Sequence, residues 1–272
     1  MELLNHPAVQ GGVAPLIVAL VIATVLARTR FAWLAIAGGY ATTMALTTGF
    51  QFSPLTASRK ILLVGLIVPV IGLAADLMPR PSRAIAAVFA LAAGLVSIWT
   101  FASVLRQQEG SALYVAAAGI AVFGSLLTAL VLALRADGLR TGAAGLGLGL
   151  ATGVAAVVSA SIGFLLAGIA VAAAAGALLL VQVIFSRNIA PRFTGALSIA
   201  ILTSLFAAGS LMLAQLPWYA LPLLLLVPLA AMLPASERLP SIVRAALLAF
   251  YALVAAVFPI AAAWYAARGS FS

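Results

Sequence analysis

Long apolar runs separated by short polar stretches make up almost the whole chain of 272 residues. A helix rises 1.5 Å per residue and must cross about 30 Å of hydrocarbon, so an apolar run of roughly 17 to 25 residues predicts one membrane span. Two runs are too long for a single span, and we expect them to turn near residues 160–162 and 215–219. The pattern then predicts ten spans: 13–27, 31–50, 61–78, 84–105, 112–134, 141–159, 163–185, 193–214, 218–233 and 242–267.

The predicted fold class is all-α, a polytopic transmembrane helical bundle in a single domain over residues 1–272. The count is nine or ten, because 218–233 is short and could be a re-entrant segment. Halves 1–135 and 136–272 would each hold five spans, which allows an inverted repeat of the transporter kind. The only shared signal is a cluster of Phe, Ser and Arg before each third span, and such clusters are also ordinary at membrane interfaces. Both interpretations stay open.

Composition excludes a water-soluble protein. Hydrophobic residues make up 65% of the chain and charged residues 7%, with a mean hydropathy of +1.26, whereas a soluble domain is about a quarter charged. A net charge of +9 would suggest nucleic acid in a soluble protein. Here the basic residues lie between apolar runs, so we interpret them as topology signals and expect no nucleic-acid partner.

The basic residues are distributed unequally between alternate loops. One set holds Arg28, Arg30, Arg80, Arg83, Arg135, Arg140, Arg187, Arg192, Arg238 and Arg244, and the other holds Arg59, Lys60, Arg106 and Arg268. Cytoplasmic loops are enriched in Lys and Arg, so the first set is expected to be cytoplasmic and both termini non-cytoplasmic. A re-entrant 218–233 would move the C-terminus to the cytoplasm. The Ala/Leu-rich composition suggests a bacterial inner membrane.

Asp76 is the one acidic residue inside a predicted span. Ionisable residues in spans are costly and are candidates for a substrate or proton site. The alternative is an interfacial ion pair with Arg80, four residues on. No other span has an acid near its middle, which disfavours a proton-coupled mechanism.

The stretch 51–60 is the most polar in the chain. Its adjacent cations, Arg59 and Lys60, together with Ser and Thr hydroxyls, could hold an anionic substrate, a lipid headgroup or the acidic surface of a partner. A solvated loop with snorkelling side chains is the alternative.

Glycines and prolines give two further features of the sequence. Gly145, Gly149 and Gly153 recur every four residues and predict a smooth helix face, used for packing within the chain, for self-association or as a substrate groove. Candidate helix breaks are Pro69, Pro222, Pro228 and Pro259.

Groups needed for most membrane catalysis are missing from the sequence. It contains no Cys, its single histidine is His6, and it has no HExxH motif or paired carboxylates, so we expect no haem, zinc or other cofactor and no enzyme activity. The favoured function is a small permease or carrier for a neutral, anionic or lipid-like substrate without a midplane proton site. The alternative is a non-catalytic accessory subunit of a larger membrane complex. Expected partners are membrane lipids, and either other membrane subunits or a second copy.

Overall fold

The computed structural model describes residues 6–78, 83–159 and 161–269, which fold into helices and connecting turns without a strand. The elements are the π-helical turn η2 (Val9–Val13), α1 (Ala14–Val25), α2 (Leu34–Thr47), α3 (Ala57–Asp76), α4 (Arg83–Leu105), α5 (Ser111–Ala133), α6 (Gly138–Val158), α7 (Ile162–Ile184), α8 (Arg192–Leu213), α9 (Ala220–Leu224), α10 (Leu226–Ala231) and α11 (Ser241–Gly269). Arg80 lies outside the described residues, and so does its expected ion pair with Asp76.

Seven of these helices, α3 to α8 and α11, are long and apolar enough to cross a membrane. The all-α class and the membrane-spanning character predicted from the sequence are thereby confirmed. Three further apolar stretches, Val9–Val25, Leu34–Thr47 and Ala220–Ala231, are shorter. The predicted count of ten spans is therefore not confirmed, because these three stretches are shorter than the seven long helices.

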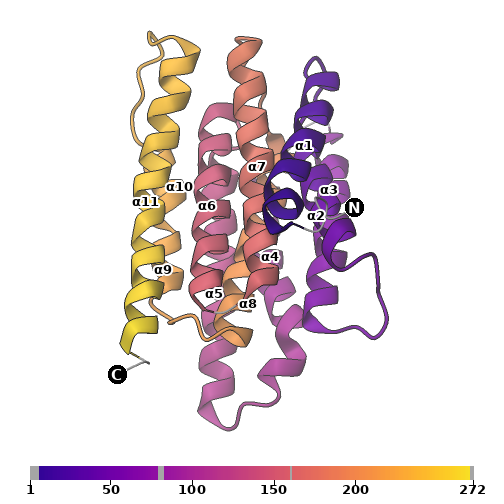
Figure 1. The fold of residues 1–272 in the computed structure, drawn as a ribbon, viewed down its shortest axis with the longest axis vertical. Coiled ribbons are helices and arrows are strands. Elements are labelled where there is room, and N and C mark those ends of the chain that lie inside the picture. The colour runs from indigo at the N-terminus through magenta and orange to yellow at the C-terminus, as the bar shows by residue number, and fades with distance from the viewer. Residues whose placement is uncertain (1–5, 79–82, 160, 270–272) are drawn as a thin grey trace.

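The helices run side by side along the long axis of the molecule (Figure 1). Helix α8 lies in the interior, where every residue from Phe193 to Ser210 is buried. Helices α4, α5 and α11 are peripheral and turn apolar side chains outward, as Val88, Leu91 and Leu95 of α4 do with 63–67% exposure. Faces of this kind require an apolar surrounding, which hydrocarbon supplies.

The three glycines spaced by four residues lie where α6 meets its neighbours. A Cβ on Gly149 would lie 2.5 Å from the backbone nitrogen of Ala172 in α7, and one on Gly153 would lie 3.0 Å from the Leu165 carbonyl oxygen. Gly145 faces α8, where an added Cβ would approach Ile199 to 2.7 Å. The absence of side chains lets α6 and α7 approach almost to backbone contact, so this face is covered within the chain.

The four candidate prolines differ in effect. Helices α3 and α11 continue through Pro69 and Pro259. The helix of the ninth segment is interrupted instead, because α9 ends at Leu224, four residues before Pro228. Proline has no N–H for the carbonyl four residues earlier, and its ring clashes with that carbonyl, which accounts for the position of the break. Pro222 lies within the short α9.

The interrupted segment nevertheless keeps one direction, with α9 nearer the C-terminal end and α10 nearer the start of α11 (Figure 1). The Arg140 guanidinium at the start of α6 donates hydrogen bonds to the carbonyls of Ala231 and Leu233, at 2.8 and 2.9 Å. The end of α10 therefore lies beside the start of α6, and the segment does not turn back. We call this end the basic end, because nine described arginines lie there: Arg28, Arg30, Arg83, Arg135, Arg140, Arg187, Arg192, Arg238 and Arg244.

An inverted repeat is not confirmed by the packing of the described helices. Helix α6 packs along most of α11. Helices α1 and α5 hold the corresponding positions in the first half, yet they make no comparable contact within the described chain. The fourth segment also differs between the two halves. In the first half it is α4, continuous over 23 residues, and in the second half it is the two short helices α9 and α10.

Candidate functional site

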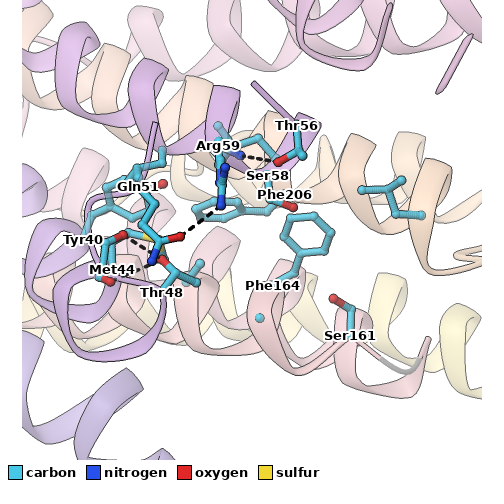
Figure 2. Close-up of a pocket in the computed structure, with 16 residues that line it drawn as sticks. Tyr40, Met44, Thr48, Gln51, Thr56, Ser58, Arg59, Ser161, Phe164 and Phe206 are labelled. Carbon is cyan, nitrogen blue, oxygen red and sulfur yellow. Dashed lines mark hydrogen bonds between the residues drawn. The ribbon is translucent and has the colours of Figure 1, made fainter. Parts of the chain in front are cut away.

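A pocket of about 580 Å³ opens at the end of the bundle opposite the basic end, between α2, α3, α7 and α8 (Figure 2). We call this end the pocket end. Helix α2 stops at Thr47, and the chain follows an irregular path before α3 starts at Ala57. This path forms one side of the pocket, while α7 and α8 form the other. The volume lies in the range of pockets that hold one small molecule.

Three aromatic rings form the apolar floor of the pocket. Tyr40 of α2 and Phe206 of α8 have ring centroids 6.0 Å apart, and Phe164 of α7 follows at 6.4 Å from Phe206. Tyr40 and Phe206 are each only 1% exposed. The Tyr40 hydroxyl makes no hydrogen bond with any described residue, although Tyr40 lines the pocket. The floor therefore offers aromatic surface and one hydroxyl donor.

Two glycines fix the positions of these rings. A Cβ on Gly65 of α3 would collide with the Tyr40 ring, and one on Gly209 of α8 would lie 2.5 Å from Cζ of Phe164. Pro69 lies one turn after Gly65 and cannot donate a hydrogen bond to its carbonyl. The floor thus packs directly against the backbone of α3 and α8.

Arg59 supplies the charge at the mouth. It lies in the first turn of α3, whose N-cap Thr56 accepts a hydrogen bond from the Arg59 backbone N–H at 3.4 Å. The guanidinium donates to the Pro54 carbonyl and to Oε1 of Gln51, both at 3.0 Å. Figure 2 shows Arg59 extending toward the Phe206 ring with Gln51 beside it. Ser58, Ser161, Thr48 and Thr56 add hydroxyls around the mouth.

The charge of Arg59 is not compensated within the described chain. Both of its acceptors are neutral, and the ion pairs found among the described residues involve Asp137 at the basic end. A guanidinium carries five N–H donors in a planar fork, so donors remain for a ligand. That fork matches a carboxylate or phosphate group. A charged mouth above an aromatic floor fits an amphipathic anion.

Lys60, the neighbour of Arg59, points elsewhere. Its Nζ donates to the Trp99 carbonyl of α4 at 3.0 Å and lies 4.9 Å from the centre of the Trp99 ring. Consecutive helical residues point about 100° apart, and here Lys60 is directed to α4 while Arg59 lines the pocket. Of the two candidate cations, the pocket receives Arg59 alone.

Asp76, the third candidate, lies at the other end of α3, about 25 Å along the helix from Arg59. Its carboxylate is buried and accepts hydrogen bonds from the backbone N–H groups of Phe193 and Thr194, at 2.8 and 3.0 Å, and from the Thr194 hydroxyl at 2.6 Å. These N–H groups belong to the first turn of α8 and have no partner inside the helix. Asp76 therefore caps α8 and does not join Arg59.

A second carboxylate, Asp137, ties three elements together at the basic end. It caps α6 by accepting from the backbone N–H groups of Leu139 and Arg140, at 3.0 and 3.3 Å. It also accepts from Arg244 of α11 at 2.5 Å and from the Asn188 side chain, after α7, at 3.3 Å. The starts of α6 and α11 are thus joined to the end of α7 through one side chain.

Within residues 6–78, 83–159 and 161–269, no three His, Cys, Asp or Glu side chains gather as a metal site would require. Comparisons with models of known protein families, with curated proteins and with solved structures found no match to this chain. The geometry of the pocket is therefore the basis for inferring a function.

Proposed function

We propose that this chain is a small, non-catalytic carrier of the bacterial inner membrane, that its substrate is an amphipathic anion, and that the pocket at Arg59 is the substrate site. The three short apolar stretches complete the crossings in this proposal, giving ten in all. Asp76 and Lys60 take no part in binding the substrate.

The observation that carries the proposal is the position of Arg59. An arginine without a carboxylate partner in the described chain is held by two neutral acceptors at the mouth of an aromatic pocket. A solvated surface arginine would not need a pocket behind it. The arrangement supports a substrate whose anionic group lies at Arg59 and whose apolar part lies against Phe206 and Phe164.

The difference between the two ends supports a carrier rather than a binding protein. The pocket is open at its own end, while Asp137 holds α6 and α11 together at the basic end. Transporters alternate between states that open a central site to one side at a time. The arrangement supports a carrier that is open at the pocket end and closed at the basic end.

Orientation follows from the basic residues. Their excess at the basic end supports a cytoplasmic location for that end. Both termini and the pocket are then non-cytoplasmic, so the substrate is bound from outside or from the outer leaflet.

The direct test is binding of dodecyl phosphate to the purified chain, with dodecanol and inorganic phosphate as probes of each half of the ligand. Arg59→Gln is expected to weaken dodecyl phosphate binding about tenfold to a hundredfold, because hydrogen bonds to a charged partner contribute about 1.5–3 kcal/mol. Lys60→Gln is the matched control, since it removes the same charge one residue away. Equal affinities for the wild type, Arg59→Gln and Lys60→Gln would refute the proposed site.

Mass spectrometry of the chain purified in mild detergent separates this proposal from its alternative. A defined amphipathic anion bound to an otherwise lone chain is the expected result. A protein partner in fixed stoichiometry would instead make the chain an accessory subunit. Such a partner would have to dock on a surface other than the Gly145, Gly149 and Gly153 face, which is covered by α7 and α8.

A further inference from the structure

A second hollow lies at the basic end, between the start of α4 and the end of α5. It has a volume of about 570 Å³. Its walls are formed by Leu132 and by alanines of α4, of α5 and of the turn after α5: Ala86, Ala87, Ala90, Ala129, Ala133 and Ala136. We call it the alanine groove. It belongs to the peripheral helix pair and is separate from the pocket at Arg59.

The groove follows from how α4 and α5 pack. Near their middle the two helices approach closely, because a Cβ on Gly94 of α4 would lie 2.6 Å from the Ala121 carbonyl oxygen of α5. Toward the basic end the facing residues are alanines, whose side chains are too short to fill the space between two helices. Ala87, Ala129 and Ala133 remain exposed there. The opening therefore faces the surroundings of the bundle.

Two arginines stand at the end of the groove. Arg83 is the first residue of α4 and is exposed, and Arg135 follows the last turn of α5. Arg135 is held in place, since its guanidinium lies 5.0 Å from the centre of the Phe193 ring and donates to the Leu132 carbonyl at 3.1 Å. Within the described residues, neither arginine has a carboxylate at ion-pair distance. Two positive charges therefore lie at the end of the apolar alanine groove.

We infer that the alanine groove binds the anionic phospholipid of the leaflet that meets the basic end. Its phosphate lies between Arg83 and Arg135, and one acyl chain lies along the alanines. Basic pockets between membrane helices suit acidic headgroups, and the groove adds a surface for the chain that carries the headgroup. This site does not depend on the proposed carrier function.

The test places the full chain in nanodiscs of equal phosphatidylglycerol and phosphatidylcholine, and counts the lipids that stay bound on release into the mass spectrometer. The wild type is expected to retain phosphatidylglycerol selectively. Arg83→Gln with Arg135→Gln is expected to lower that selectivity about 30-fold, from the attraction of each basic residue for an acidic lipid. Ala133→Leu, which fills the exposed groove and keeps both charges, is expected to lower retention of either lipid.

The matched control is Arg28→Gln with Arg187→Gln, which removes two positive charges from the same end but outside the groove. Selectivity that stays at the wild-type value in this control supports the site. An equal loss in the control and in the groove variants would reduce the effect to general surface charge and overturn the inference. Displacement of the lipid by an equal concentration of inorganic phosphate would also overturn it, because the acyl chain would then contribute nothing.

Discussion

Arg244 and Arg140 at the basic end use their donors in the opposite way to Arg59 at the pocket end. At the basic end Arg244 pairs with the Asp137 carboxylate at 2.5 Å, and Arg140 binds two backbone carbonyls and lies 3.4 Å from the same carboxylate. At the pocket end Arg59 has only neutral partners within the described chain. At the basic end the N–H donors of Arg244 and Arg140 hold helices together, whereas the charge and the remaining donors of Arg59 are available to a ligand.

This contrast separates stability from binding. Asp76 and Asp137 both satisfy the N–H groups of a helix start at the basic end, on α8 and α6 respectively. No carboxylate among the described residues does so around the pocket. Changes at Asp76 and Asp137 are therefore expected to affect unfolding, and changes at the pocket mouth are expected to affect ligand affinity alone.

The largest expected effect is the sidedness of labelling. The chain contains no cysteine, so single cysteines report one position each. Ser58→Cys at the pocket mouth is expected to react completely with a membrane-impermeant maleimide on intact cells. Ser236→Cys at the basic end is expected to react only after the cells are permeabilised. The reverse pattern would invert the proposed orientation, and labelling of both sites from outside would contradict placement at opposite faces.

A smaller but clear effect is expected from Asp137→Ala. The change removes a helix cap and leaves Arg244, whose side chain is 16% exposed, without its carboxylate. We expect the free energy of unfolding, measured by SDS titration in mixed micelles, to fall by about 2–4 kcal/mol. Glu109→Ala, an exposed acid at the pocket end, is the control and should change it little. Equal values for the two variants would remove the distinction between the ends.

The smallest expected effect is that of Tyr40→Phe. The Tyr40 hydroxyl makes no hydrogen bond with a described residue, so its loss should leave stability unchanged. If the hydroxyl binds the substrate, affinity for dodecyl phosphate should fall about threefold, the contribution of one neutral hydrogen bond. Isothermal titration and SDS unfolding of the same preparation measure both quantities. A marked loss of stability with unchanged affinity would assign Tyr40 to the fold alone.

Much of the architecture could be predicted from apolar length, because helix is the only way for a single segment to satisfy its backbone in hydrocarbon. The helices α4 to α8 begin and end within a few residues of the predicted spans. Two of the three shorter stretches are shorter than predicted, whereas the first begins earlier than predicted, at Val9. Apolar residues continue past the ends of α2 and past the break at Leu225, and hydrophobicity does not reveal where a helix stops inside an apolar run.

The candidate site could be predicted only in part. The polar stretch 51–60 indicates Arg59, which lies in the pocket, but it indicates Lys60 equally. The floor residues Tyr40, Phe164 and Phe206 resemble any aromatic in a span, since only the fold brings α2, α7 and α8 together. The sequence suggests Arg80, four residues on, as the partner of Asp76, whereas the described hydrogen bonds of Asp76 reach α8, more than a hundred residues away.

The interrupted ninth segment has a consequence for the surrounding lipid. Helices α9 and α10 together span about 18 Å, while the adjacent α11, with 29 residues, spans about 43 Å. A bilayer that contacts both must thin beside the first or tilt the second, and each distortion has a cost for every ångström of mismatch. The acyl-chain length of the surrounding lipid is therefore expected to affect this protein, because shorter lipids match the hydrophobic length of α9 and α10 better.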